Sequence, residues 1–292
     1  MSNKKVVLIT GCSDGGLGSA LAIAFYKAGY RVIATARNLS KLTETRKLGI
    51  EEIQLDVLSD TSLSEAAKKL DTLTGNRLDI LVNNAGEGYN MPAVDSDLSK
   101  VRKVFELNVF SVITVTHAFL PSLVATPDAK VVNNISVAGR INLPFQGTYN
   151  ASKAAAMSYT ENLRLELAPF DIRVISLMTG GVKTNFFNNV EKNYGQGANA
   201  LPHDSIYRVV PSGIKLMKDP EGSINADGVE NADYWAKNVV ADLSKAKPPH
   251  QIWRGSNAGR LRWLVHLPVG MMDGALKGIS GLDEVEKAVK RK

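Results

Sequence analysis

The most constraining feature of this chain is a regular alternation of short apolar runs with longer helix-like stretches, which runs from residue 6 to residue 178 and resumes at residues 232–254. Strands that alternate with helices of roughly ten or more residues are typical of βαβ units, which build a parallel sheet. The alternation therefore predicts an α/β fold, a Rossmann-type doubly wound parallel sheet. The expected strands are 6–10, 31–36, 52–56, 79–82, 130–135, 171–178 and 250–254, and the expected helices include 40–48, 60–73, 99–123, a stretch that opens near residue 149, and 232–243.

A glycine-rich turn, GCSDGGLG, joins the first expected strand to the first expected helix and holds Gly11, Gly16 and Gly18. Glycines at this place let the backbone approach a pyrophosphate, which the amino terminus of the following helix stabilises. A plain tight turn is the alternative. Cys12, inside the turn, is interpreted as a small filler and not as a redox group.

The second expected strand ends at Arg37, and no acid stands there. In dinucleotide-binding folds an acid near this point binds the ribose 2′-hydroxyl, whereas an arginine accommodates a 2′-phosphate. Arg37 therefore favours NADP over NAD, and a solvated surface arginine is the alternative. Other residues of interest also follow expected strands, where open α/β sheets bind their ligands; they are Asp56, Asn83, Ser136 and Gly180.

Tyr149 and Lys153 stand four residues apart at the start of an expected helix, and Ser136 lies thirteen residues before Tyr149. Residues i and i+4 share one face of a helix, so the ammonium is expected near the phenol. A nearby cation favours the phenolate and lowers the tyrosine pKa from its usual value near 10. Such a tyrosine can serve in general acid–base catalysis. Taken alone, the pair also matches an ordinary surface contact.

The composition narrows the classes of function. Cys12 is the only cysteine and the four histidines are scattered, so neither an internal disulfide nor a metal site is expected. The amino terminus has no apolar secretory segment, and no run of about 18 apolar residues suggests a membrane span, so a cytoplasmic protein is expected. Basic stripes with interleaved aromatic residues are missing, so no nucleic-acid partner is expected.

The net charge of +6 is concentrated near the end of the chain, where residues 245–292 include ten basic and four acidic residues. A basic tail can meet anionic lipid, a phosphorylated substrate or nucleic acid, and a solvated surface helix is the alternative. Within it, residues 261–276 (LRWLVHLPVGMMDGAL) are apolar, flanked by basic residues and too short to span a bilayer. This segment can lie on a membrane, cover the substrate pocket, contact another subunit or pack on its own domain.

Taken together, the motifs resemble the short-chain dehydrogenase/reductase family over nearly the whole chain. Two places depart from the family pattern: the glycine turn has one extra residue, and Thr179-Gly180-Gly181 replaces a common Pro-Gly. Within the family, the segments MTGGVKT and IWRGSNAGRLRWL resemble fungal NADPH-dependent 1-acyldihydroxyacetone-phosphate reductases and related fungal reductases. The matching pieces are Thr10-Gly11 with Gly16 and Gly18, Asp56, Asn83-Asn84-Ala85-Gly86, Asn108, Ser136, and Tyr149 with Lys153.

The resemblance implies an NADP(H)-dependent enzyme that acts on CH–OH and C=O groups. Tyr149 would donate the proton, while Lys153 would hold the ribose and keep the tyrosine pKa low. Ser136 would bind the carbonyl oxygen, and Asn108 would anchor a water. Cofactor contacts are expected at Gly11, Ser13, Gly16, Leu17, Gly18, Arg37, Asp56, Val57, Asn83, Ala85, Gly86, Tyr149, Lys153, Gly181, Val182 and Thr184.

We expect one domain over residues 1–292, because a chain of this length fits one large α/β domain and has no repeat or linker. Residues 1–184 are the expected cofactor-binding and catalytic core. Residues 185–227 lose the alternation, and loops this long are usually functional or disordered, so a substrate lid is expected there. Residues 228–292 are expected to hold a helix, the last strand and the basic, apolar tail.

Several functions stay open at this point. The leading hypothesis is reduction of a hydrophobic or lipid-like ketone with NADPH, in a homo-oligomer (dimer or tetramer) as in many relatives. With a membrane contact through residues 261–276, the expected location is the periphery of the endoplasmic reticulum or of lipid droplets. The alternatives are a carbonyl reductase of fungal secondary metabolism, for a polyketide, terpenoid or steroid-like ketone, and a non-catalytic dinucleotide-binding regulator.

Overall fold

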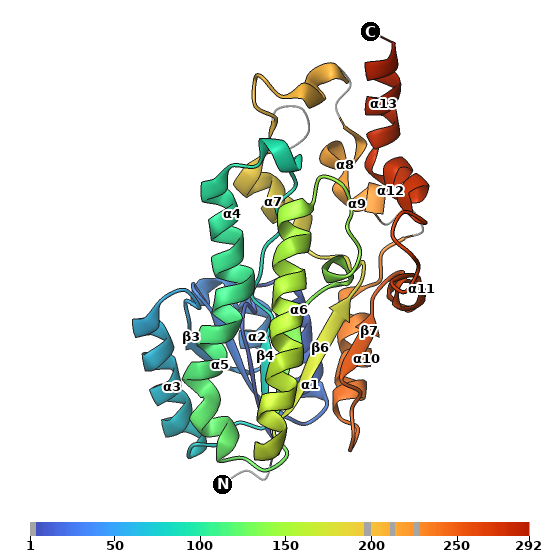
Figure 1. Ribbon diagram of the computed structural model, residues 1–292. Helices are drawn as coiled ribbons and strands as arrows, with labels where there is room; N and C mark the ends of the chain where they lie inside the picture. The colour runs from blue at the N-terminus through green and yellow to red at the C-terminus, as the bar shows by residue number, and fades with distance from the viewer. Residues whose placement is uncertain (1–3, 196–199, 211–213, 225–227, 292) are drawn as a thin grey trace.

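Seven parallel strands form the central sheet of the protein, in the order β3-β2-β1-β4-β5-β6-β7 (Figure 1). The computed structural model describes residues 4–195, 200–210, 214–224 and 228–291. All seven strands lie where the alternation predicts them, so the predicted α/β fold is confirmed. The strands are β1 (Val6–Ile9), β2 (Arg31–Ala36), β3 (Glu51–Gln54), β4 (Ile80–Asn83), β5 (Lys130–Asn134), β6 (Arg173–Thr179) and β7 (Gln251–Arg254).

The strand order reverses at β1, since the chain builds outward to β3 on one side and from β4 to β7 on the other. Ligands in such sheets bind outside the carboxyl ends of the strands near this switch. The helices are α1 (Leu17–Lys27), α2 (Thr43–Lys47), α3 (Asp60–Thr74), α4 (Leu98–Phe105), α5 (Ser111–Val124), α6 (Gly147–Leu167), α7 (Phe186–Tyr194), α8 (Lys215–Lys218), α9 (Pro220–Ile224), α10 (Ala232–Leu243), α11 (Ala258–Leu264), α12 (Asp273–Ser280) and α13 (Leu282–Lys290).

Short helical turns complete the chain: η1 (Leu39–Lys41), η2 (Ala93–Asp95), η4 (Val137–Gly139), η5 (Ala168–Phe170) and η7 (Ile206–Val209) are 3-10 helices, and η3 (Glu106–Phe110) is a π-helix. Two predicted helices are therefore less regular than expected. The stretch 40–48 is divided between η1 and α2. The stretch 99–123 is interrupted at its middle by η3, around Asn108.

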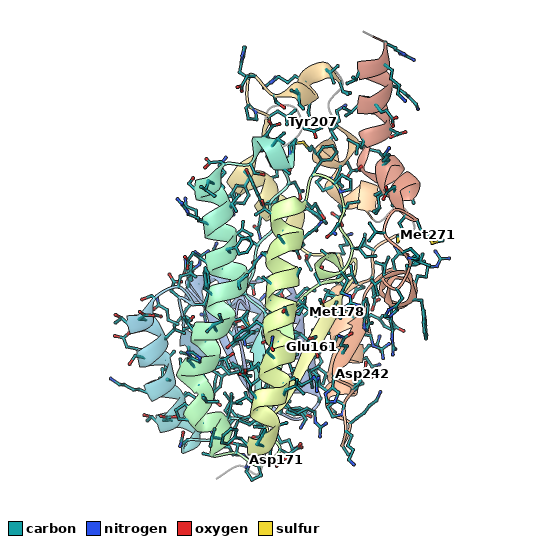
Figure 2. All side chains as sticks on the ribbon, in the orientation of Figure 1. Glu161, Asp171, Met178, Tyr207, Asp242 and Met271 are labelled. Carbon is teal, nitrogen blue, oxygen red and sulfur yellow. The ribbon has the colours of Figure 1, made fainter. Side chains whose placement is uncertain are left out.

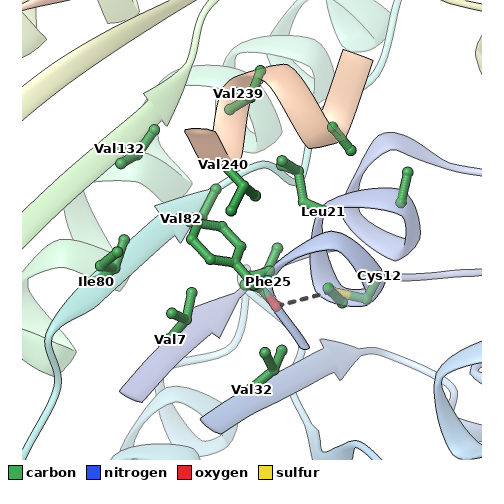
Figure 3. Packing of buried hydrophobic residues seen from close by; sticks show 14 of the residues in the cluster. Val7, Cys12, Leu21, Phe25, Val32, Ile80, Val82, Val132, Val239 and Val240 are labelled. Atoms are coloured by element: carbon green, nitrogen blue, oxygen red, sulfur yellow. Dashed lines mark hydrogen bonds between the residues drawn. The ribbon is translucent and has the colours of Figure 1, made fainter. Parts of the chain in front are cut away.

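Two hydrophobic clusters fix the helices on the two faces of the sheet. On one face α1 and α10 pack through Leu21, Phe25 and Val239 onto strand residues such as Val82 (Figure 3). The other face is covered by α3, α5 and α6. Phe25 is fully buried, and burial of such a side chain contributes roughly 1.5–3 kcal/mol. This two-sided burial explains why the strands read as continuous apolar runs.

A third hydrophobic cluster lies beyond the carboxyl ends of the strands. It combines the loop after β4, through Tyr89 and Met91, with Leu216 and Met217 of α8 and with Val285 of α13. Figure 1 shows α7, α8, α12 and α13 gathered at this end of the molecule. The stretch 185–227, expected as an irregular lid, thus contains helices and is joined to the carboxyl-terminal tail.

The continuous helical stretch Leu98–Val124 is long and apolar enough to cross a membrane by length and composition alone. No such segment was expected from the sequence. Half of its most apolar window is buried inside the protein, and Val115, Phe119 and Leu123 pack in the cluster that faces the sheet. The stretch therefore has the burial expected of a core helix, because the apolar face that raises its hydropathy is already covered by protein.

Candidate active site

Tyr149, Ser136 and Lys153 meet at the carboxyl ends of β5 and β6. The Ser136 hydroxyl hydrogen-bonds the Tyr149 phenol. Helix α6 carries both Tyr149 and Lys153 on one face, and the Lys153 Nζ lies 6.0 Å from the centroid of the tyrosine ring. The same Nζ donates to the carbonyl of Asn134 at 2.8 Å. The predicted proximity of phenol, hydroxyl and ammonium is therefore present in the fold.

The expectation that Lys153 lowers the tyrosine pKa is wrong for this arrangement. Burial raises the pKa of Tyr149 to about 12, an effect that the hydrogen bond from Ser136 only partly offsets. Burial also lowers the pKa of the Lys153 ammonium to about 8. Desolvation of both groups outweighs their attraction because the ammonium bonds a carbonyl and not the phenol. At neutral pH both groups carry their protons.

Ser136 has an unusual backbone, with φ 138° and ψ 154°. A non-glycine residue rarely adopts this region, and such strain costs about 1–3 kcal/mol and concentrates at functional sites. The Ser136 Oγ accepts a hydrogen bond from the Ala138 N–H at 3.1 Å, which ties the hydroxyl to the following turn. This backbone conformation is the one in which the Ser136 hydroxyl lies beside Tyr149.

Asn108 occupies the π-helix η3 and is buried. Its amide forms a pair of bonds with the backbone of Glu87: Nδ2 donates to the carbonyl at 2.8 Å, and Oδ1 accepts from the N–H at 2.9 Å. Nδ2 also donates to Ser152 Oγ at 3.0 Å. A π-turn inside an α-helix often marks a functional position, and here it aims Asn108 at the loop after β4. One lone pair of Oδ1 stays available for a further donor.

Asn134, which is not among the site residues expected from the sequence, connects three strand ends. Its carbonyl accepts from Lys153, its Nδ2 donates to Asn84 Oδ1 at 2.9 Å, and its Oδ1 accepts from Thr179 Oγ1 at 2.7 Å. Asn84 in turn donates to the carbonyl of Thr10 at 2.9 Å. This network connects β1, β4, β5 and β6 at the carboxyl ends of the strands, outside which open α/β sheets have their ligand-binding crevice.

The glycine turn fits a dinucleotide phosphate. Gly11 has φ +72°, and a Cβ there would lie 3.0 Å from the backbone of Ala85, so the turn needs glycine. Helix α1 starts at Gly16 with no side-chain cap and no acid in its first turn, which leaves amide donors and a positive dipole end for an anion. The extra residue of this turn is accommodated by the segment after β6, where the Asn185 N–H donates to the Gly15 carbonyl at 3.0 Å.

Lys153 provides a second test of whether the site fits a dinucleotide cofactor. It is buried and, within the described ranges, has no acidic partner. A buried cation without a counter-charge is unfavourable unless a ligand solvates it. The hydroxyl groups of a nicotinamide ribose are the kind of acceptor that would do so. The residues present thus fit the cofactor that the resemblance implies.

The expected adenosine contacts differ in how accessible they are. Arg37 is exposed at the end of β2, and its side chain has no ion pair among the residues that the structure describes. Asp56 is half-buried and accepts from the Leu58 N–H at 3.1 Å. Val57 packs inside the protein, so its backbone alone remains for a ligand.

Asn83 does not present its side chain to the crevice. It is buried, and its Nδ2 donates to Thr116 Oγ1 at 3.1 Å and to Asn133 Oδ1 at 2.8 Å. Its neighbour Asn84 makes the crevice-side bonds instead, because Asn83 ends the buried strand and Asn84 follows it. The Asn83 amide is therefore engaged inside the protein, and the backbone of Asn83 is the part left for the expected cofactor contact.

The remaining expected contacts lie around the turns. Gly18 packs closely on the Gly11 carbonyl, while Ser13 and Leu17 are half-buried beside it. After β6, Gly181 exchanges backbone bonds with Ser256, and the Thr184 hydroxyl accepts from the Phe186 N–H at 3.3 Å. Val182 and Gly86 complete this rim; a Cβ on Gly86 would lie 3.1 Å from Asn108 Oδ1 and 3.5 Å from Lys153 Nζ.

Helix α7 covers the site, and no helix was expected there from the sequence. The Phe186 ring lies 5.6 Å from the Tyr149 ring between centroids. The apolar residues Phe186, Phe187, Val190 and Tyr194 follow a helical spacing that could have predicted this element. Asparagines and lysines between them hid the pattern.

Glu87 holds the far end of α7. Its carboxylate accepts a hydrogen bond from the Tyr194 hydroxyl at 2.7 Å, while its backbone is the part paired with Asn108. Tyr194 also packs edge-on against Tyr89, at 4.9 Å between ring centroids. Glu87 thus connects α7, which lies over the site, to Asn108, which lies inside it.

Tyr194→Phe is expected to loosen α7 without unfolding the protein. The ring contacts stay, but the bond to a half-buried carboxylate is lost, and bonds to charged groups are worth about 1.5–3 kcal/mol. Backbone amides of α7 should exchange with deuterium about tenfold faster or more, measured by mass spectrometry. Tyr207→Phe in the same segment is the control; unchanged exchange in Tyr194→Phe would refute the contact.

Two other predicted features concern metals and redox chemistry. In the described parts of the chain, no three His, Cys, Asp or Glu side chains are grouped so as to hold a metal ion. Cys12 is fully buried and donates to the Ile9 carbonyl (Figure 3). Burial raises the pKa of its thiol to about 12, which keeps the sulfur protonated and unreactive.

Comparison with known proteins adds to this geometry. A family model described as short chain dehydrogenase matches residues 5–195. A short-chain dehydrogenase/reductase of Pestalotiopsis microspora is 41% identical over 290 residues, which cover 99% of both chains. An NADPH-dependent 1-acyldihydroxyacetone phosphate reductase of Schizosaccharomyces pombe is 35% identical, and 93% of each chain is covered. The crystal structure of a short-chain dehydrogenase from Streptomyces avermitilis has a TM-score of 0.73 at 27% identity and covers 100% of this chain and 99% of that one.

Proposed function

The chain belongs to the short-chain dehydrogenase family, and we propose that it uses NADPH to reduce the ketone of a hydrophobic or lipid-like substrate to a secondary alcohol. The observation that carries this proposal is the Ser136–Tyr149 hydrogen bond beside the buried Lys153. The NADPH-dependent relative supports the cofactor, as does the exposed Arg37 at the end of β2, where a 2′-phosphate would lie.

Each residue contributes one physical effect. Bound NADPH supplies the hydride. The Tyr149 phenol is protonated at neutral pH and gives its proton to the carbonyl oxygen, as general acid catalysis requires. The Ser136 hydroxyl donates to the same oxygen and stabilises the charge that develops there. The Lys153 ammonium donates hydrogen bonds to the ribose hydroxyls. The free lone pair of Asn108 Oδ1 accepts a hydrogen bond from a water near that ammonium.

The surroundings of Tyr149 favour an apolar substrate. The Phe186 ring packs on Tyr149, and Tyr89, Met91 and Phe145 form the apolar cluster under the lid. Apolar walls with a few polar groups are typical of sites for hydrophobic ligands. A ketone of low polarity is therefore the substrate class that this end of the fold fits best.

Whether the substrate carries a phosphate separates two candidates. The S. pombe relative favours an acyl-dihydroxyacetone phosphate. Acidic side chains favour a phosphate-free ketone: Glu191, Asp219 and Glu221 line a cavity of about 100 Å³ between α7 and α9, and no described lysine or arginine lines it. In addition, lysines of α12 and α13 pair with acids of α13, as Lys277 does with Glu286. We favour the phosphate-free ketone.

Oxidation of NADPH by the purified protein tests this choice. A 1-acyldihydroxyacetone phosphate is compared with bulky phosphate-free ketones of similar hydrophobic size. We expect the larger kcat/KM for the phosphate-free ketones. A preference for the phosphorylated lipid would reverse the assignment, and no turnover of any ketone would favour the non-catalytic regulator.

The pH dependence of NADPH binding tests Lys153. The pKa of Lys153 in the folded protein is about 8, below the usual value of 10.5 for a lysine, so the ammonium is present below pH 8 and is lost above it. Because the ligand binds the charged form, NADPH affinity should fall about tenfold per pH unit above pH 8. Fluorescence titration measures this; Lys153→Met should bind weakly with little pH dependence. A flat wild-type profile between pH 7 and pH 9.5 would contradict the assignment.

A further inference from the structure

We propose that the carboxyl-terminal segment between β7 and α13 is a docking surface for an anionic lipid bilayer. The surface, here called the tail patch, consists of Trp263, Leu264, Leu267, Val269 and Met271 with the basic residues Arg260, Arg262 and Lys277. It goes beyond the proposed reaction, because the chemistry at Tyr149 does not require any residue of the patch.

The apolar side chains of the patch point into solvent. The Trp263 side chain is 72% exposed and that of Met271 is 66% exposed, and Val269 is fully exposed. Figure 2 shows Met271 on the outer side of the molecule, away from the sheet. Exposed apolar residues scattered singly need no explanation, but a contiguous group on one segment marks an interaction surface.

The shape of the patch favours a soft partner over a rigid one. Val269 stands between Pro268 and Gly270 in the connection from α11 to α12, and Gly270 has φ +94°, so the chain forms a protruding turn. A protein partner would need a matching socket for this protrusion, whereas a bilayer admits it without one. Trp263 adds a ring of the type enriched at membrane interfaces.

The charge of the patch indicates which kind of bilayer. Arg260 and Arg262 stand against one acid in the same stretch, Asp273, while the charge of Lys277 is offset by its ion pair with Glu286 of α13. The Arg262 guanidinium lies 5.8 Å from the Trp263 ring, so a cation and an interfacial aromatic ring are presented together. An apolar face with basic residues beside it is the pattern of proteins that lie in the interface of anionic membranes.

A second copy of this chain fits the patch less well. A two-fold contact presents the same surface from both sides, so the arginines of one copy would face those of the other. Like charges brought together in this way oppose association. The same charges are attracted to anionic headgroups.

The position of the patch gives the contact a consequence for the site. Gly181, at the end of β6, exchanges backbone bonds with Ser256, directly before α11. On the other side, Gly281 packs against Lys215 of α8, within the lid. Docking through the patch would therefore place the lid and the crevice beside the bilayer, from which an apolar ketone could enter.

Co-sedimentation of the full-length protein with vesicles tests the proposal. We expect binding to vesicles of phosphatidylcholine with phosphatidylserine and little binding to phosphatidylcholine alone. Val269→Asp with Met271→Asp should lower binding at least tenfold, since both side chains are exposed and neither supports the fold. Leu165→Asp with Phe170→Asp, which are 62% and 60% exposed at the opposite end near Asp171 (Figure 2), is the matched control and should bind like wild type.

Two further readouts complete the test. Arg262→Gln should weaken binding about fivefold, as expected for one basic residue at an anionic surface. The fluorescence of Trp263 should shift to shorter wavelength on binding, and Trp263→Phe should remove the shift. No binding to the anionic vesicles, or binding unaffected by Val269→Asp with Met271→Asp, would overturn the proposal. So would dimers in wild type that the double variant converts to monomers, without vesicle binding.

Discussion

Tyr149→Phe is expected to lower kcat for ketone reduction by roughly 10²–10⁴-fold, the range that general acid catalysis contributes. The variant keeps the ring and its contact with Phe186, and it removes only the hydroxyl that bonds Ser136. NADPH binding should change little, because Lys153 and the glycine turn are untouched. Steady-state kinetics and NADPH fluorescence titration measure the two quantities separately.

A second tyrosine on the same helix provides the control. Tyr159 lies ten residues further along α6. It packs against the hydrophobic cluster on the face of the sheet that α3, α5 and α6 cover. Tyr159→Phe should leave kcat within about twofold, since its hydroxyl does not reach the site. Residual turnover above a tenth of wild type in Tyr149→Phe would mean that another group delivers the proton.

Arg37→Asp is expected to weaken NADPH binding by about 10²–10³-fold while NADH binding stays within a few-fold. The change removes the charge-assisted bond that we propose between Arg37 and the 2′-phosphate and places a carboxylate there instead, and like charges at contact cost several kcal/mol. NADH lacks the 2′-phosphate, so the affinity for NADH should change little. The Kd values for both cofactors, measured at one ionic strength, give the comparison.

Lys68→Asp controls for the change in net charge. Lys68 is exposed on α3, away from the end of β2, and the substitution alters the charge of the protein by the same amount. It should shift both affinities slightly and equally. Parallel losses of NADPH and NADH affinity in Arg37→Asp would show that Arg37 acts on the shared part of the dinucleotide or on the fold.

The strands were the most predictable part of this fold, and burial explains why. Strands covered on both faces must be apolar throughout, so Val6–Ile9 and Ile80–Asn83 stand out against polar surroundings. Their ends carry the glycine turn and Asn84 into one crevice by topology alone. The proximity of Tyr149 and Lys153 was predictable for a related reason, because the two residues are local neighbours on one helix.

Features that depend on three-dimensional packing could not be predicted from the sequence. The pKa of Tyr149 was expected to fall because a neighbouring charge is visible in the sequence, whereas desolvation, which raises it, is not. Asn83 and Asn84 looked equivalent until the fold buried one and left the other at the crevice. Asn134 and Glu87 gain their roles from partners distant in sequence.

The measurement that tests the central claim most directly is transfer of label from NADPH deuterated at the nicotinamide C4 position. Wild-type protein and a bulky phosphate-free ketone are incubated with the labelled cofactor, and the alcohol is analysed by mass spectrometry. We expect one deuterium on the carbinol carbon with the wild-type protein, and almost no labelled alcohol with Tyr149→Phe. NADPH that binds without passing any label to a ketone would contradict it and identify the protein as a dinucleotide-binding regulator.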